Sequence, residues 1–251
     1  MMLGARTAAW AKGGYTAKDY VQDGLVAMWD GIENAGWGMH DAAATVWKDL
    51  VGSNDLQKKG TGSLVWGENC ANLLKNVYFE LSSFTEMYNA VIAGAFSFET
   101  VFAVDDVSNI NGSIFGLGNK RTLWAYVNET VTIQTHLRQS ASSIPLGENH
   151  LGEVHVLSFN GESVFIDGTK YADVASSTTS RTGNSMFSLG KLPILNDFMN
   201  GRIMCTRSYS LALSASEIAT NYTVDKDRFN LPTVKPPDFG QDSHSLEGDK
   251  K

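Results

Sequence analysis

Two short stretches of the chain gather carboxylate and amide oxygens, the side-chain ligands that calcium prefers. The candidate ligands are Asp49, Asn54 and Asp55 in the first stretch and Asp105 and Asp106 in the second. Calcium takes about six to eight oxygens, some of which backbone carbonyls can supply. Asp and Asn are also favoured turn residues, because their side chains bond to nearby backbone groups. A calcium site and ordinary turns therefore both stay open, and calcium is the one cofactor that we consider.

Aromatic residues beside polar side chains indicate two places where a sugar could bind. A sugar has an apolar ring face and a rim of hydroxyls, so its site needs an exposed ring next to hydrogen-bonding groups. Trp37 lies between two glycines, which predicts an exposed indole in a loop. The second place is one face of a strand pair over 122–138, with Trp124, Tyr126, Gln134, His136 and Arg138. Both tryptophans could instead be core residues, and the polar face could simply be solvated.

Catalysis by two neighbouring carboxylates finds no matching pattern. A retaining glycosidase holds its two carboxyl groups about 5–5.5 Å apart, one as nucleophile and one as acid and base. Glu99 alternates with a serine and a valine, so it has no acidic neighbour on its strand face. Glu148 and Glu153 are five positions apart and do not share a strand face. We therefore predict no catalytic residue and no enzyme.

Histidine and cysteine add little to this list of reactive residues. The five histidines are scattered, and their spacing predicts no zinc site. Cys70 and Cys205 are too few for a disulfide scaffold, and two free, buried thiols are the favoured interpretation. No glycine-rich phosphate loop and no nucleophile triad is present.

The overall composition excludes several classes of protein. Lys and Arg number 20 against 27 Asp and Glu, which gives a net charge of −7. Such a chain lacks the positive field that binds nucleic acid. Hydrophobic residues make up 43% and charged residues 19%, which predicts a folded domain with a sizeable core. A membrane helix needs a run of about 18 apolar residues, and the sequence has none.

The elements that must position these residues are mostly short strands separated by turns. In 95–105, phenylalanines and a valine alternate with polar residues, which predicts a strand with one buried face. The dipeptides Asn160-Gly161 and Asp167-Gly168 predict two hairpin turns in a three-stranded meander over 153–172.

One helix is marked near the end of this region. Ser214 and Glu217 form a capping box, which predicts a helix over 215–229. A weaker box begins at Thr16 and predicts a single turn before the first strand.

The chain divides into three parts. We expect residues 1–22 to form an N-terminal arm and not a signal peptide, because Arg6 and Thr7 interrupt the apolar run. Residues 23–230 form the folded domain. Residues 231–251 hold three of the five prolines and predict an extended or disordered tail.

The order of segments resembles the laminin G-like branch of the concanavalin A-like lectin and glucanase domains. GLVAMWD (24–30) and WKDLVGSNDL (47–56) are similar to the opening strand and loop of that branch, and EVHVLSFNGESVFIDGTK (153–170) to its central hairpin. MNGRIMCTRSYSLALSASEIATNY (199–222) resembles its closing strand and helix. The resemblance implies an all-β, two-sheet antiparallel jelly-roll sandwich of roughly a dozen strands with one short C-terminal helix. It also raises the expectation of one structural calcium.

The function expected from this resemblance is a non-enzymatic, carbohydrate-binding recognition module on a phage particle or cell surface. Its partners would be a surface glycan or receptor, and neither nucleic acid nor a membrane. A second hypothesis is a structural subunit of a virion that uses its terminal arms to bind virion proteins or copies of itself. A glycoside hydrolase is the third. The fold alone does not decide among the three.

Overall fold

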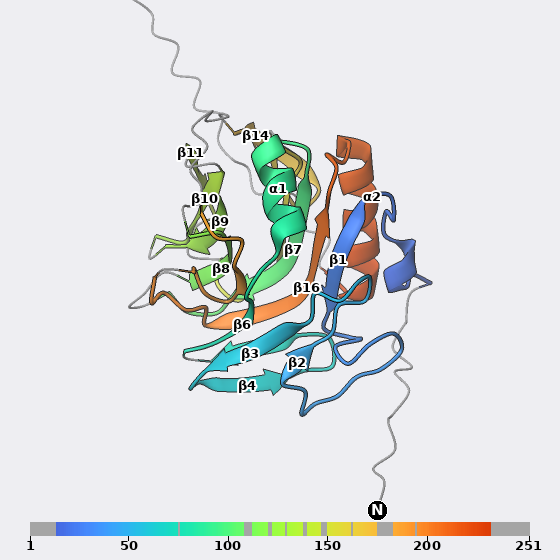
Figure 1. Cartoon of the computed structure of the whole chain (residues 1–251), viewed down its shortest axis with the longest axis vertical. Helices are drawn as coiled ribbons and strands as arrows, with labels where there is room; N and C mark the ends of the chain where they lie inside the picture. Colours follow the sequence, from blue (N-terminus) through green and yellow to red (C-terminus); the bar gives the residue numbers. More distant parts are fainter. Residues whose placement is uncertain are drawn as a thin grey trace, which may run out of the picture.

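Two antiparallel β-sheets of eight strands each lie face to face in the computed structural model, and a helix covers the outer face of one of them (Figure 1). The structure describes residues 14–74, 76–107, 112–119, 122–128, 130–137, 140–146, 150–161, 163–174, 183–193 and 195–231. The predicted all-β sandwich of two antiparallel sheets with a short C-terminal helix is therefore confirmed. The described residues form sixteen strands rather than about a dozen.

Sheet I is the sheet that carries the helix. Its order is β14-β13-β12-β7-β16-β5-β4, and β1 also pairs with β16. Along β16, β7 occupies one edge, while β5 and β1 share the other. The strands are β1 (Leu25–Asp30), β4 (Ser63–Trp66), β5 (Ala71–Leu74), β7 (Ser97–Val104), β12 (His155–Phe159), β13 (Ser163–Ile166), β14 (Thr169–Asp173) and β16 (Gly201–Tyr209).

Sheet II is the opposite layer and runs in the order β11-β10-β9-β8-β15-β6-β3-β2. Its strands are β2 (Val46–Trp47), β3 (Leu56–Gly60), β6 (Val77–Leu81), β8 (Gly112–Leu117), β9 (Leu123–Val127), β10 (Thr132–Leu137), β11 (Ser140–Pro145) and β15 (Phe187–Leu189). A second helix, α1 (Thr85–Ala93), links β6 to β7 and thus connects the two sheets.

The main core lies between the sheets and is rich in aromatic rings. Phe98 of β7 meets Phe115 of β8 with ring centroids 4.3 Å apart, and Trp29 of β1 stacks on Phe187 of β15 at 5.3 Å. The predicted alternation of β7 is confirmed, because Phe98 and Phe102 face this core. The prediction of only one buried face is wrong. All eight residues of β7 are buried, since the second face lies beneath the C-terminal helix.

That helix, α2 (Ala215–Arg228), begins and ends close to its predicted limits. The capping box is present, since the Ser214 hydroxyl accepts from the Glu217 amide and the Glu217 carboxylate accepts from the Ser214 amide. A short 3₁₀ turn, η1 (Ala17–Asp19), lies beside α2, capped by Thr16 as predicted. Together they form a second hydrophobic layer on sheet I.

Turn chemistry explains the meander of β12, β13 and β14. Asp167 and Gly168 both have positive φ, +49° and +73°, as the turn that matches strand twist requires. The sequence did not mark α1, because Phe84 at its N-cap makes no side-chain capping bond. Within the described residues, neither helix is long and apolar enough to cross a membrane.

Candidate functional site

A network of buried ionic groups lies between sheet I and α2. At its centre Arg207 of β16 forms a two-pronged bond to Asp225 of α2, with both N–O distances 2.7 Å. Its Nε donates to Glu99 of β7 at 3.1 Å. All three side chains are at most 1% exposed. Asn221 of α2 donates a further bond to Glu99 at 2.7 Å, so helix and sheet are joined by charged groups as well as by apolar packing.

Tyr20 extends this network towards the surface. Its ring lies on the Arg207 guanidinium, 3.9 Å from the ring centroid, and its hydroxyl donates to Asp225 at 2.7 Å. The same hydroxyl accepts from Arg228, the last residue of α2, at 3.2 Å. Arg228 also donates to Asp30 at the end of β1. Tyr20 and Asp30 therefore fix the position of the Arg228 side chain.

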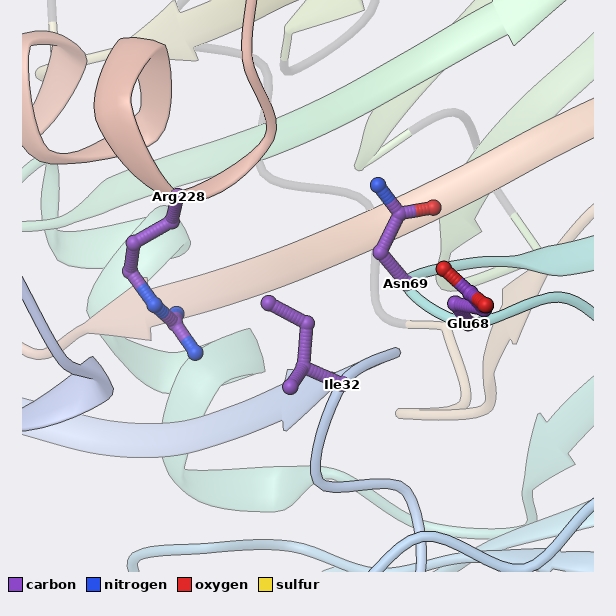
Figure 2. Close-up of a pocket in the computed structure, with 4 residues that line it drawn as sticks. All are labelled: Ile32, Glu68, Asn69 and Arg228. Atoms are coloured by element: carbon purple, nitrogen blue, oxygen red, sulfur yellow. The ribbon is translucent and has the colours of Figure 1, made fainter. Parts of the chain in front are cut away.

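The corner pocket is a cavity of about 140 Å³ lined by Ile32, Glu68, Asn69 and Arg228. Figure 2 shows Arg228 reaching from the end of α2 towards Ile32, while Glu68 and Asn69 lie across the cavity on the loop before β5. The pocket thus combines a cation, a carboxylate, an amide and an apolar side chain. Among the described residues, Nη1 is the only Arg228 nitrogen with a hydrogen-bond partner, so Nη2 and Nε remain as donors.

Burial and neighbouring charges shift the pKa values of the ionisable side chains around the pocket. Burial is the largest influence on Arg228 and works to lower its pKa. The charge and hydrogen bond of Asp30, together with Tyr20 and Cys205, outweigh it, so the pKa rises and the guanidinium stays charged. Burial, with the negative charge of Asp30 added, raises the pKa of Glu33. One Glu33 oxygen accepts from the Gly38 amide, while the other is buried and has no partner among the described residues.

Trp37 lies in the same loop as Ile32 and Glu33. It is 42% exposed, and Lys18 of η1 lies over its ring at 5.3 Å. The prediction that this tryptophan is exposed is confirmed. Sequence reasoning missed the residues that line the pocket, which come from three separate stretches of chain. The one related signal in the sequence is the capping box, which predicts the helix α2 that ends at Arg228.

The predicted sugar-binding face of β9 and β10 is assembled but largely covered. Gln134 lies opposite Tyr126, and His136 opposite Trp124, so these four residues share one face of the strand pair as predicted. Trp124 is only 1% exposed, and its indole donates to the Gly118 carbonyl at 2.8 Å, while His136 is 7% exposed. The indole face is therefore not offered to solvent. The side chain of Arg138 lies outside the described residues, and sugar binding here stays a prediction.

The predicted calcium ligands all have partners within the chain. Asp49 accepts from the backbone amides of Val51 and Asn54, as in an ordinary turn, and from that of Met28 on β1. Asp55 pairs with Lys48. In the second stretch Asp105 pairs with Arg202, and Asp106 accepts from Asn200. Calcium binding by these residues stays a prediction. The prediction of two free, buried cysteines is confirmed.

Comparison with known proteins rests on the fold alone. No protein-family model matches the chain, and no curated protein matches it. The sialidase of Trypanosoma rangeli in complex with sialic acid matches with a TM-score of 0.61 at 17% identity, over 88% of this chain and 36% of the sialidase chain. A second structure of the Trypanosoma rangeli sialidase matches with a TM-score of 0.61 at 16% identity, over 88% of this chain and 36% of the sialidase chain.

A second kind of match is a structure from work on botulinum neurotoxin type C, whose cell entry depends on two ganglioside molecules. Its TM-score is 0.54 at 11% identity, over 80% of this chain and 51% of the matched chain. The chain has a lectin-like β-sandwich fold. It spans about a third of the length of the sialidases that it matches.

These matches correct the function predicted from sequence. The sequence predicts a non-enzymatic adhesion module or a virion subunit, with a glycoside hydrolase as the third hypothesis. The matched sialidases are glycoside hydrolases, which favours the hydrolase over the adhesion module. Because the matches also include a structure related to a neurotoxin, the fold does not decide whether this chain is catalytic.

Proposed function

We propose that this chain is the substrate-binding domain of a glycoside hydrolase that acts on sialylated glycans. In this proposal the corner pocket holds the carboxylate of a sialic-acid-type sugar. The observation that carries the proposal is the position of Arg228, a buried guanidinium held by Tyr20 and Asp30 with two nitrogens still able to donate. A planar guanidinium can bind a carboxylate through two parallel hydrogen bonds.

The other pocket residues fit the remaining groups of such a sugar. Asn69 and Glu68 can exchange hydrogen bonds with hydroxyls, and Ile32 offers an apolar surface to a methyl group. The exposed Trp37 offers a ring for the next sugar along. At about 140 Å³ the cavity is smaller than the about 300–1,000 Å³ typical of sites that enclose a whole ligand, so it suits one acidic group.

Two further observations support binding rather than cleavage by this part of the protein. Glu99, the carboxylate first considered for catalysis, is tied to Arg207 and Asn221 beneath α2 and does not reach the surface. The chain covers 36% of the sialidase chains, which suits one domain of a larger enzyme. We also propose that the sandwich belongs to the laminin G-like branch, on the sequence resemblance of the segment 199–222, which forms β16 and the start of α2.

The test compares the binding of 3′-sialyllactose and lactose by titration calorimetry. We expect the acidic sugar alone to bind. Arg228→Lys keeps the charge beside Asp30 but loses the planar fork. Hydrogen bonds to charged groups contribute about 1.5–3 kcal/mol, so the affinity should fall by about 10- to 100-fold. Arg202→Lys is the matched control, because Arg202 also pairs with a single aspartate but lies outside the pocket.

Asn69→Asp provides the opposite test, because it places a negative charge beside the bound carboxylate. We expect it to abolish binding of sialyllactose without changing the thermal unfolding temperature. Equal binding of the two sugars, or full affinity in both pocket variants, would refute the proposal. Release of free sialic acid by the chain would refute a purely substrate-binding role.

A further inference from the structure

Three side chains with metal-ligating atoms come together where the chain enters β12. They are His150, Glu153 and His155, and one ligand atom from each lies within 4.8 Å of the other two. The His150 Nδ1 and a Glu153 oxygen are 2.8 Å apart, and the two imidazole rings have centroids 5.4 Å apart. The expectation that the histidines are scattered is wrong for this pair. This group, here called the histidine cluster, is separate from the corner pocket in its residues and its strands.

His155 shows that the cluster points to a ligand. The side chain is 3% exposed, and its Nδ1 bonds to Asp167 at 2.9 Å. Its Nε2 is buried and has no hydrogen-bond partner among the described residues. An imidazole held by a carboxylate in this way carries its proton on Nδ1, so Nε2 presents a lone pair. A buried lone pair without a donor costs free energy unless something binds it.

Asp167 is itself held firmly. Its other oxygen accepts from the Val156 amide at 2.8 Å, and its backbone occupies the turn between β13 and β14. The carboxylate therefore cannot swing away and leave His155 free to change tautomer. A carboxylate behind a metal-binding histidine has this arrangement in known sites, where it orients the ring and strengthens the ligand.

We propose that the histidine cluster binds a zinc ion through His150, Glu153 and His155, with Asp167 orienting His155. Two imidazole nitrogens and one carboxylate are a ligand set that suits zinc and not calcium, which prefers oxygen. Glu153 and Asp167 together carry two negative charges, which balance the two positive charges of the ion. Three protein ligands leave a fourth, tetrahedral position for water.

The geometry requires small movements of the exposed ligands only. Zinc–ligand bonds of about 2.0–2.2 Å place tetrahedral ligand atoms about 3.4 Å apart, closer than the present limit of 4.8 Å. His150 and Glu153 are 22% and 43% exposed, so both can rotate towards the fixed His155. In the nearby Arg202, Nη2 donates to Asp105 at 3.0 Å and to the Gly152 carbonyl at 2.6 Å, while Nε is buried without a partner among the described residues. The bound ion would tie the segment 150–154 to the β13–β14 turn.

The test titrates zinc into the full chain, prepared without a histidine tag and stripped with EDTA. We expect one equivalent to bind, and the thermal unfolding temperature to rise by about 5–10 °C at a hundredfold excess of free zinc over Kd. Cobalt(II) in place of zinc should give the visible absorption of a four-coordinate nitrogen and oxygen site. This test is independent of sugar binding.

Asp167→Asn is the decisive variant. The asparagine oxygen can still accept from the Val156 amide, but its NH₂ group then faces Nδ1 of His155. The imidazole must accept at Nδ1 and carry its proton on Nε2, which removes the lone pair from the zinc site. We expect a 10- to 100-fold loss of zinc affinity, roughly the effect of losing such an orienting partner elsewhere. The unfolding temperature in EDTA should not change.

Two more variants separate this site from zinc bound elsewhere. Glu153→Gln removes a half-exposed ligand and should weaken binding by at least tenfold. His40→Gln removes a half-buried histidine outside the cluster, whose Nδ1 contacts the Gly31 carbonyl, and should leave affinity unchanged. Failure of the wild-type chain to bind zinc, or wild-type affinity in both Asp167→Asn and Glu153→Gln, would overturn the proposal.

Discussion

Replacing Arg207 by leucine should destabilise the fold more than any other single loss of charge in the described structure. Arg207 is the cation between Glu99 and Asp225, and no water reaches the three side chains, which are at most 1% exposed. Leucine fills part of the space but leaves two buried carboxylates without their partner. Breaking a buried ion pair from one side costs about 3–5 kcal/mol. For a chain of this length that corresponds to a fall in unfolding temperature of about 6–20 °C.

The pH dependence of this loss tests the electrostatic explanation. Burial raises the pKa of Glu99, and the nearby Arg207 charge works against that rise. A raised pKa means that protonated Glu99 favours folding below its ordinary pKa, and that this contribution is lost as the pH rises through the folded-state pKa. Without Arg207 the pKa rises further. The difference in free energy of unfolding between the Arg207→Leu variant and the wild type should therefore become smaller from about pH 8 to about pH 5, as Glu99 takes up a proton.

Equilibrium unfolding in urea measures this difference in free energy of unfolding at each of the two pH values. Arg202→Leu is the control, because the pair of Arg202 and Asp105 is 30% and 41% exposed. Such a pair contributes about 0–1 kcal/mol, so its loss should be small at either pH. A loss below about 1 kcal/mol for Arg207→Leu, or a gap that does not depend on pH, would refute the reasoning.

Two further predictions concern the turns and caps that set the path of sheet I and α2. Gly168→Ala should lower the free energy of unfolding by about 2–5 kcal/mol, because φ is +73° and the new Cβ would lie 2.7 Å from the Tyr222 ring. At Gly38, where φ is +68°, a new Cβ meets no described atom within 4 Å, so Gly38→Ala should cost only about 1–2 kcal/mol. Equal urea midpoints for the two variants would contradict this. Ser214→Ala removes the cap of α2 and should cost about 1 kcal/mol, while Ser214→Gly should cost only a few tenths; the urea midpoints of the two variants test the order.

Local signals explain why much of the fold could be predicted from the sequence. The positive φ angles of Asp167 and Gly168 follow from their residue types, and the box of Ser214 and Glu217 fixes the start of α2. Where the local signal is weak, the prediction failed. Helix α1 begins at Phe84, whose side chain makes no capping bond. Its one local signal is Gly94 at the other end, with φ +77°, and packing against the core stabilises the helix further.

The pocket could not be predicted because its residues are distant in the chain. Ile32, Asn69 and Arg228 come together only after β1 and β5 have paired with β16 and α2 has packed across them. The ionic network around Glu99 could not be predicted for the same reason. The alternation of Glu99 with the phenylalanines was predicted correctly, but its own face is buried against expectation, and its partner Arg207 is 108 positions away. A carboxylate without an acidic neighbour on its strand gave no sign that it belonged to an ionic network.

The network beneath α2 is better explained by what it positions than by the stability that it adds. Replacing a complete buried ion pair by apolar residues of similar volume is often neutral or stabilising, so sheet I and α2 could pack without these charges. Asp225, itself bonded to Arg207, accepts from the Tyr20 hydroxyl, and that hydroxyl with Asp30 holds Arg228 at the corner pocket. An unsupported arginine at the end of a helix would have several rotamers and would lose side-chain entropy on binding a ligand. The network has already fixed this side chain on folding, so a carboxylate that enters the pocket meets a guanidinium in its binding orientation.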